Sequence, residues 1–175
     1  MQITKGTAGD QEELSTLYDD LIDHLEATVN YPGWRKGIYP TAETARAGIS
    51  EGTLFVARER AGGPIAGTVV LNHLPEEAYR GEPWGIDCPE EDAVVIHTLA
   101  LHPDWLGHGV GQALMDFAAQ HARQTGALTV RLDVSEHNTT AIALYERCGY
   151  RRVSKVNLGL PYEHLKWFYL YELVL

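Results

Sequence analysis

The sequence predicts a single domain over residues 1–175, of the α/β (α+β) class, with a twisted, mostly antiparallel sheet of six to seven strands and about four helices. Short apolar runs of strand length alternate with segments of helical periodicity along the chain. The runs at 53–60 and 65–73 are joined by Ala-Gly-Gly-Pro, which is typical of a hairpin turn. The run at 128–134 follows a crossover helix, so it should pair in parallel with the run at 93–101.

The N-terminal part of the chain predicts a short strand, two helices and a loop between them. Residues 2–5 can form the strand, and Asp10 with Glu13 resembles a capping pair that begins the first helix. Apolar residues then repeat at helical spacing, at Leu14, Leu17, Tyr18, Leu21, Ile22 and Leu25. An aromatic-rich loop at 27–40 precedes a short second helix that ends near Gly52.

The C-terminal half predicts an acidic insertion, two further helices and two final strands. Its expected segments are an insertion at 74–92, helices at 110–125 and after Asn138, and strands at 150–156 and 165–174. The last of these strands is apolar, and we expect it at the edge of the sheet. Because an apolar edge strand is suited to burial against a second copy, the sequence predicts a homodimer.

Charge and cysteine content limit the classes of function. The chain has 24 acidic and 14 basic residues, a formal net charge of −10, which argues against a nucleic-acid partner and suits a cationic amine substrate. Two cysteines, Cys88 and Cys148, do not make a disulfide framework, which favours a reduced, cytoplasmic setting. We expect no signal peptide and no membrane-spanning segment. We also expect no metal site, because His102 and His108 lack a surrounding ligand cluster.

The segment 99–114, LALHPDWLGHGVGQAL, predicts a strand that ends before Pro103, a glycine loop and the first turns of a helix. That order places backbone N–H groups at a helix N-terminus, where unpaired amides and the helix dipole favour an anion. Gly107, Gly109 and Gly111 leave room for the anion to approach the backbone. The loop therefore predicts a site for a phosphate-bearing cofactor, with a connector that binds no ligand as the alternative.

Two other kinds of phosphate loop fit this segment poorly. A dinucleotide loop has the spacing G-x-G-x-x-G after the first strand of its unit, whereas this loop has G-x-G-x-G and lies past the middle of the chain. A nucleotide P-loop has Lys and then Ser or Thr after its last glycine, whereas Gly111 is followed by Gln112 and Ala113.

The segment 131–152, RLDVSEHNTTAIALYERCGYRR, predicts a strand, a short loop, a helix, a glycine stop and another strand. Asn138 suits the N-cap of that helix, and Gly149 suits the position after its end. Asn138, Ala141 and Tyr145 lie on one face of the helix. This face predicts a groove with a proton donor at its end, unless Tyr145 is a half-buried core aromatic.

Together the two segments resemble the GNAT acetyltransferase superfamily. LHPDWLGHGVG is similar to the family's V-x-P-x-x-[QR]-G-x-G-[IV]-G, and NTTAIALYERCGY to its N-x-x-A-x-x-x-Y-x-x-x-G-[FY]. The resemblance is close over residues 93–152 and implies the GNAT fold, in which the two parallel strands splay apart and admit the pantetheine arm of acetyl-CoA. Leu106 stands where the family usually has Gln or Arg, which we expect to alter cofactor affinity without removing the site.

The resemblance implies an acetyl-CoA-dependent N-acetyltransferase that moves an acetyl group to a primary amine by direct attack in a ternary complex. It makes Tyr145 the general acid that protonates the departing sulfur. It implies that the backbone of residues 99–101 holds pantetheine and offers one N–H to the thioester oxygen. The cofactor-binding residues that it implies are Leu99, Ala100, Leu101, Leu106, Gly107, His108, Gly109, Val110, Gly111, Gln112, Asn138, Ala141 and Tyr145.

The base that removes the amine proton has two candidates. His97 lies on the strand before the glycine loop, on the same face as Val95 and Leu99. HTLALH is similar to H-A-L-A-V-H in the arylalkylamine branch of the family, which implies a role for His97 in proton removal, directly or through water. Asp133 on the neighbouring strand is the alternative. Each residue also has a purely structural interpretation. His97 is then a hydrogen-bonded core histidine, and Asp133 is a carboxylate that binds a loop backbone.

We expect the acceptor pocket to form from the loop at 27–41 and the insertion at 74–92. Its candidate residues are Tyr31, Trp34, Tyr39, Trp84 and Asp133. The aromatic side chains among them could instead only anchor irregular loops. A small-molecule amine is the expected acceptor, and the alternatives are a protein or peptide amine and a non-catalytic acyl-CoA-binding module on the same fold.

Overall fold

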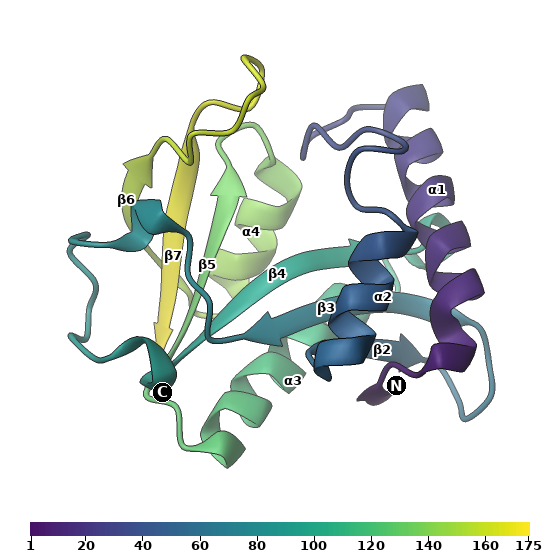
Figure 1. Cartoon of the computed structure of the whole chain (residues 1–175), viewed down its shortest axis with the longest axis horizontal. Helices are drawn as coiled ribbons and strands as arrows, with labels where there is room; N and C mark the ends of the chain where they lie inside the picture. The colour runs from purple at the N-terminus through teal and green to yellow at the C-terminus, as the bar shows by residue number, and fades with distance from the viewer. The chain divides into compact units, whose positions relative to one another are not determined.

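Seven strands and four helices make up the computed structural model, which describes residues 1–175 (Figure 1). In chain order they are β1 Gln2–Lys5, α1 Gln11–Ala27, α2 Ala42–Glu51, β2 Leu54–Arg58, β3 Ile65–Asn72, β4 Ala93–Leu101, α3 Val110–Thr125, β5 Thr129–Ser135, α4 Thr139–Arg147, β6 Arg151–Val156 and β7 Phe168–Val174. The strand order is β1-β2-β3-β4-β5-β7-β6, and β4 and β5 are parallel. The predicted mixed sheet with a central parallel pair is therefore confirmed.

The chain divides into two compact units, which are described separately. The first unit contains Met1–Asn30, Trp34–Leu71 and His97–Leu114, and the second contains Tyr31–Gly33, Asn72–Ile96 and Met115–Leu175. The division passes within β4 and within α3. No helix of the chain has the length and apolar character needed to cross a membrane.

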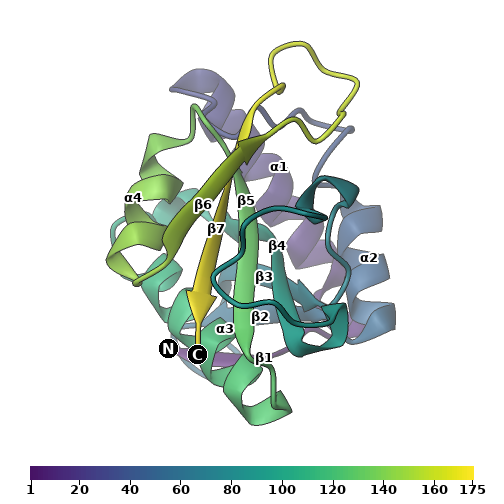
Figure 2. The same ribbon diagram turned by 90° about the vertical axis from the view of Figure 1, so that its left-hand side faces the viewer.

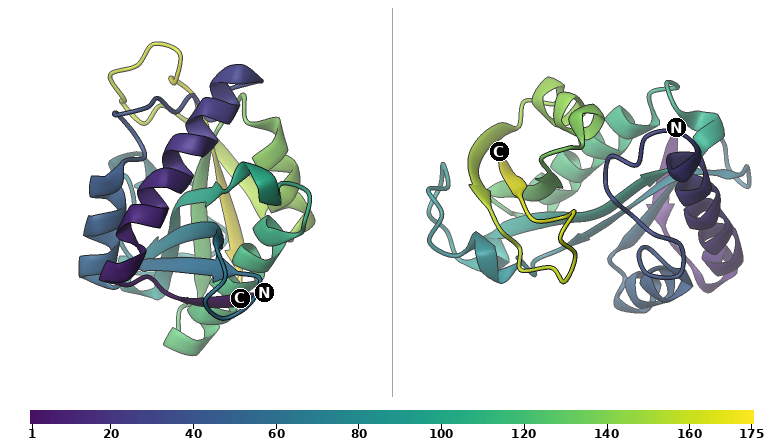
Figure 3. Two further views of the ribbon diagram at one scale, coloured as in Figure 1. Left: turned by 90° about the vertical axis from the view of Figure 1, so that its right-hand side faces the viewer. Right: turned by 90° about the horizontal axis from the view of Figure 1, so that it is seen from above.

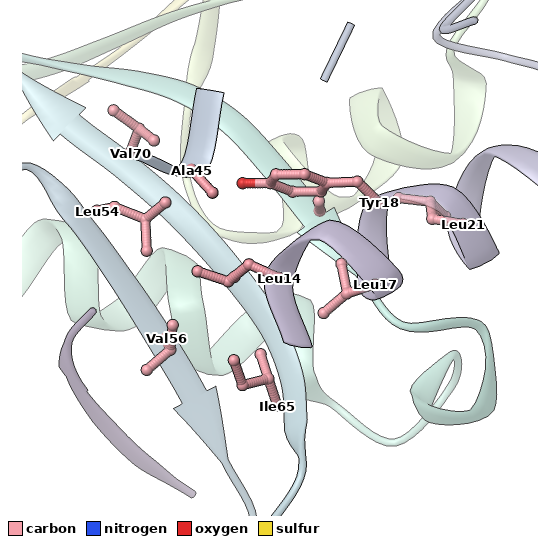
Figure 4. Close-up of a cluster of buried hydrophobic side chains, with 10 residues drawn as sticks. Leu14, Leu17, Tyr18, Leu21, Ala45, Leu54, Val56, Ile65 and Val70 are labelled. Atoms are coloured by element: carbon pink, nitrogen blue, oxygen red, sulfur yellow. The ribbon is translucent and has the colours of Figure 1, made fainter. Parts of the chain in front are cut away.

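In the first unit, the apolar stripe of α1 packs on the antiparallel strands β2 and β3. Leu14, Leu17 and Tyr18 are fully buried, and they pack with Leu54 of β2 and Ile65 of β3 (Figure 4). Helices α1 and α2 lie side by side, as the left-hand view of Figure 3 shows. The predicted periodicity of the first helix is thus the periodicity of its buried face.

Asp10 is the N-cap residue of α1, as predicted, but the capping bonds expected of Asp10 and Glu13 are absent. Asp10 accepts a hydrogen bond from the backbone N–H of Thr7 at 2.7 Å, and Glu13 accepts one from the N–H of Ile65 at 2.6 Å. Both carboxylates also pair with Arg58, at 2.5 and 3.0 Å. Both side chains bind the β2–β3 hairpin, which is distant in sequence. Asp10 also caps the short 3-10 turn Ala8–Asp10 through Thr7, and neither side chain caps α1.

In the second unit, the predicted edge position of the C-terminal strand is wrong. Strand β7 pairs antiparallel with β5 on one side and with β6 on the other (Figure 2). The chain returns after β6 and pairs with β5, so Leu170 and Tyr171 of β7 are buried within the unit. An interior strand has no free edge to offer to a second copy, and the edge on this side is β6.

The parallel register pairs Ala93–Ile96 of β4 with Thr129–Leu132 of β5. Each candidate base directly follows the last of these pairs in its own strand, since His97 follows Ile96 and Asp133 follows Leu132.

Candidate functional site

The glycine loop, residues 106–111, has the conformation that its sequence predicts. Gly107 and Gly109 have φ values of 79° and 78°, in the left-handed region that favours glycine. Both are exposed, and no atom lies within 4 Å of the place that a Cβ would occupy at either residue. The loop therefore presents bare backbone to a space that a ligand can enter.

Backbone donors gather where this loop enters α3. The helix begins at Val110, and the carbonyl of Gly109 accepts the N–H of Ala113 at 3.0 Å. The N–H groups of Gly109, Val110 and Gly111 belong to the first turn and have no acceptor within the helix. Such a cluster, at the positive end of the helix dipole, fits a phosphate or pyrophosphate group.

The two histidines near the loop make local contacts. His102 accepts the N–H of Asp104 at 3.2 Å and lies 3.5 Å from a carboxylate oxygen of Asp20. His108 lies 3.1 Å from the carbonyl of Leu106, whose own side chain is 42% exposed. No group of three or more His, Cys, Asp or Glu side chains in the chain could hold a metal ion.

The part of β4 that precedes the loop contains a strained residue. Thr98 has a φ of 44°, and it is the one residue of the chain other than glycine with a positive φ. A β-branched residue is rarely found there, because its Cβ crowds the backbone. The Thr98 hydroxyl is hydrogen-bonded to the hydroxyl of Tyr39. His97 is half-buried just before this residue, and the predicted pantetheine-binding segment 99–101 follows it.

The aromatic residues predicted for the acceptor pocket are distributed over both units. Trp34 is half-buried against the core cluster of the first unit, and its ring meets the Tyr39 ring edge-on at 5.9 Å. Tyr31 is half-buried and belongs to the second unit. In the second unit, Trp84 donates from Nε1 to the carbonyl of Tyr79 at 2.8 Å and therefore anchors the insertion.

The helix α4 presents the predicted groove residues. Asn138 caps it by accepting the N–H of Ala141 at 3.2 Å, and Gly149 ends it with a φ of 86°. Tyr145 is 6% exposed, and burial, followed by the charge of Asp133, raises the pKa of its hydroxyl well above the usual range. A phenol in this environment stays protonated and remains a hydrogen-bond donor.

Asp133 forms a close pair with a residue that sequence reasoning missed. The hydroxyl of Tyr79 donates to Oδ2 of Asp133 at 2.8 Å. Burial raises the pKa of Asp133 to about 6, with a further rise from the charge of Glu76, while the Tyr79 hydrogen bond opposes the shift. Tyr79 itself is 2% exposed. The available signal was a single tyrosine within the acidic run Glu-Glu-Ala-Tyr-Arg of the insertion.

Comparison with protein families gives a match over most of the chain. A family model described as the acetyltransferase (GNAT) family matches residues 16–150. A protein named mycothiol acetyltransferase from Propionibacterium freudenreichii subsp. shermanii is 33% identical over an aligned length of 152, and the match covers 81% of this chain and 43% of that protein. A protein of the same name from Geodermatophilus obscurus is 44% identical over 57 residues, which are 33% of this chain and 18% of that protein. The chain thus spans less than half the length of these curated relatives.

Solved structures share the fold at low sequence identity. An acetyltransferase of the GNAT family from Listeria monocytogenes has a TM-score of 0.76 and 19% identity, with 99% of this chain and 94% of that chain covered. A ribosomal-protein-alanine N-acetyltransferase from Brucella melitensis has a TM-score of 0.72 and 17% identity, with 100% of both chains covered. An acetyltransferase from Salmonella typhimurium, solved with its cofactor acetyl-CoA, has a TM-score of 0.69 and 15% identity, with 99% and 92% covered.

Proposed function

Because this chain belongs to the acetyltransferase (GNAT) family, we propose that it transfers the acetyl group of acetyl-CoA to a primary amine of a small molecule. Family membership supports the predicted enzyme class, an acyltransferase that uses acetyl-CoA. The amine acceptor and the roles of individual residues are our proposal. The name of the curated relatives supports a small-molecule acceptor over a protein.

Acetyl-CoA supplies the acetyl group as a thioester, and the glycine loop fits its pyrophosphate. The N–H groups of Gly109, Val110 and Gly111 would hold that group, and the left-handed glycines would let it approach. The backbone of residues 99–101 would hold the pantetheine arm and offer an N–H to the carbonyl oxygen. Asn138 and Ala141 would order the groove on α4.

The buried hydroxyl of Tyr145 is the observation on which the proposed chemistry rests. During transfer the acceptor nitrogen bonds to the acetyl carbon, the carbon–sulfur bond breaks, the nitrogen loses one proton and the sulfur gains one. We assign the second proton to Tyr145, because its phenol is protonated at neutral pH and lies on the same face of α4 as Asn138 and Ala141. For the first proton, His97 is the proposed base and Asp133 is the alternative.

Release of free thiol from acetyl-CoA, measured against a panel of amines, tests this function. The panel contains arylalkylamines, polyamines, amino acids, aminoglycosides and short peptides. Turnover with one class of small amine supports the proposal and identifies the acceptor class. Turnover only with peptides favours the macromolecular alternative, and tight binding of acetyl-CoA without turnover favours the non-catalytic module.

The role of Tyr145 is tested by Tyr145→Phe, with Tyr150→Phe as the matched control. Both tyrosines are buried, their ring centroids lie 6.3 Å apart, and the Tyr150 hydroxyl has no hydrogen-bond partner. We expect Tyr145→Phe to lower kcat by about 10²-fold with acetyl-CoA affinity unchanged, because a positioned general acid contributes that much. Tyr150→Phe should keep its turnover. Equal turnover in the two variants would remove Tyr145 from the mechanism.

The choice of base is tested by the pH–rate profile of His97→Ala. Loss of the base should move the profile to higher pH, where the free amine itself loses its proton. An unshifted profile would point to Asp133, water or an amine that binds already neutral.

Location and assembly complete the proposal. The free thiols of Cys88 and Cys148 support a cytoplasmic location. Sedimentation of the purified chain tests the predicted homodimer, for which the interior strand β7 no longer supplies the surface.

A further inference from the structure

The insertion, residues 74–92, is fastened to one face of strand β5 by polar side chains. Thr129, Arg131 and Asp133 alternate along β5 and therefore share that face. Thr129 and Arg131 both donate to one carboxylate oxygen of Glu172 in β7. The other carboxylate oxygen of Glu172 accepts the N–H of Gly85 in the insertion at 2.5 Å. The insertion is thus a positioned part of the second unit, although it contains no strand.

The arginine of this row holds the insertion from a second direction. Arg131 donates to the carbonyl of Ile86 at 2.7 Å, and its guanidinium lies 4.3 Å from the centroid of the Trp84 ring. Trp84 in turn donates to the carbonyl of Tyr79. This chain of contacts sets the place of Tyr79, whose ring lies 5.3 Å from that of Trp84.

Asp133, the third side chain of the row, differs from the other two. Thr129 and Arg131 are buried and bonded within the insertion network, whereas Asp133 is half-buried and accepts one hydrogen bond, from Tyr79 at 2.8 Å. A carboxylate can accept about four hydrogen bonds. Oδ1 of Asp133 therefore keeps its accepting capacity, and an ammonium group with three N–H donors matches it in charge and hydrogen bonding.

We propose that Asp133 binds the acceptor amine as its ammonium ion, and that Tyr79 is the positioning residue that orients and ionises this carboxylate. The inference rests on the proposed function and adds to it the charge state in which the acceptor arrives. The acceptor class is a small, protonated primary amine. Binding changes no covalent bond, and the amine proton is removed afterwards at the base.

The groups that face Asp133 agree with this role. From the insertion, Tyr79 donates to it and Glu76 adds negative charge; from α4, the Tyr145 hydroxyl lies within the reach of its charge. Its partner across the sheet in β7 is the uncharged Leu170. Burial keeps the Tyr79 hydroxyl protonated, because it raises the pKa of Tyr79 well above the usual range. Tyr79 therefore remains a donor and favours the ionised form of Asp133.

The test compares Tyr79→Phe with Tyr171→Phe across pH 5 to 9, in the complete chain with the best amine of the panel. The two variants remove matched bonds, because Tyr171 donates to a carboxylate oxygen of Glu146 at 2.8 Å and is also buried. In Tyr79→Phe the acidic limb of the pH profile of kcat/KM for the amine should shift to higher pH by about one unit. The reason is that the ionised Asp133 loses the hydrogen bond from Tyr79. The change should lie in KM for the amine, with kcat at high pH and KM for acetyl-CoA preserved. Tyr171→Phe should keep the limb of the wild type.

The variant Asp133→Asn should remove the contribution of Asp133 to this acidic limb and leave that of the base, and it should raise KM for the amine by about tenfold or more, which corresponds to one lost charge-assisted bond. An unshifted limb in Tyr79→Phe, or an equal shift in Tyr171→Phe, overturns the inference.

A measurement without turnover separates this inference from the proposed function. The carboxyl carbon resonance of Asp133 should titrate near 6 in the wild type and higher in Tyr79→Phe, and it should move when phenethylamine is added. Absence of thiol release together with this response would overturn the transferase and retain the ammonium site. Titration near 4 with no response to the amine would overturn the site, whatever the turnover.

Discussion

The hydroxyl of Tyr39 is hydrogen-bonded to the hydroxyl of Thr98, so the loop before α2 holds the strained residue of β4 in place. A β-branched residue with a φ of 44° costs about 1–3 kcal/mol, and it persists only where its surroundings enforce it. The proposed pantetheine-binding segment 99–101 begins at the next residue. A loop expected to contact the acceptor therefore also supports the backbone expected to hold the cofactor.

A double-mutant cycle tests this pair. Tyr39→Phe and Thr98→Val each remove one hydroxyl and keep the shape of the side chain, so each should lower the free energy of unfolding by about 0.5–1.5 kcal/mol. The double variant should lose about as much as either single variant, because both remove the same bond. Urea denaturation measures the three losses. Losses that add in full would show that the two hydroxyls act independently.

Substitution of a loop glycine should separate backbone strain from cofactor binding. Gly109→Ala and Gly62→Ala are matched, since both glycines have positive φ, 78° and 67°, and open space where a Cβ would lie. Each variant should lose about 1–2 kcal/mol of stability, the cost of an L side chain in the left-handed region. Only Gly109→Ala should also weaken acetyl-CoA binding, by about tenfold (about 1.4 kcal/mol), because its methyl group intrudes on the first-turn N–H groups. Calorimetric titration with acetyl-CoA gives the affinities, and equal affinities in the two variants would place the pyrophosphate elsewhere.

The buried ion pair of the second unit should be costly to break, and an apolar replacement should not restore the lost stability. Arg131 and Glu172 are paired at 3.1 Å with their side chains 10% and 3% exposed. Arg131→Ala leaves a buried carboxylate without its partner and should lower the free energy of unfolding by about 3–5 kcal/mol. Arg131→Met combined with Glu172→Leu should recover little of that loss, because it leaves the carbonyl of Ile86 and the N–H of Gly85 without their partners. Chemical denaturation compares the variants.

An exposed ion pair serves as the control for that experiment. Lys155 pairs with Glu136 at 2.6 Å, but the two side chains are 39% and 21% exposed. Lys155→Ala should cost less than about 1 kcal/mol, because solvent screens the pair. A loss as large as that of Arg131→Ala would contradict the role assigned to burial.

The stability of the chain should depend on the ionisation of Asp133. Burial raises the pKa of Asp133 to about 6 in the folded chain, above its ordinary value near 4. Between these values the folded state binds more protons than the unfolded state, so the free energy of unfolding falls as the pH rises from about 4 to about 6. Asp133→Asn keeps an oxygen that can accept from Tyr79 and carries no charge. It should exceed the wild type in stability at pH 8 and match it near pH 4. Equal stability of the two at pH 8 would contradict the raised pKa.

Local patterns in the sequence predicted much of the fold and of the glycine loop. Strand β4 and helix α3 begin and end at the predicted residues, because Pro103 and the glycines between them interrupt both periodicities. The N-cap at Asn138 and the helix end at Gly149 were also predicted, because each depends only on residues a few positions away in the sequence.

Features that depend on distant partners were mispredicted or missed. The pattern of apolar residues predicts that β7 is a strand but does not predict which strands pair with it. Its place between β5 and β6 was therefore not predicted. The carboxylate of Asp10 binds Arg58, 48 residues away, where short-range rules predicted a helix cap. Tyr79 lies in an insertion without periodicity, and its partner Asp133 is 54 residues further along the chain.

The interior place of β7 has a consequence for biosynthesis. Strands β5 and β6 are joined through β7, and Glu172 of β7 accepts the N–H of Gly85 in the insertion. While the chain is being synthesised, β5 and β6 emerge before the strand that links them. At a synthesis rate of about 5–20 residues per second, residues 168–174 are synthesised on the order of a second after these two strands. The second unit therefore completes its sheet only after residues 168–174 have been synthesised, and a ribosome stalled before Phe168 would leave β5 and β6 without the strand that joins them and prone to aggregation.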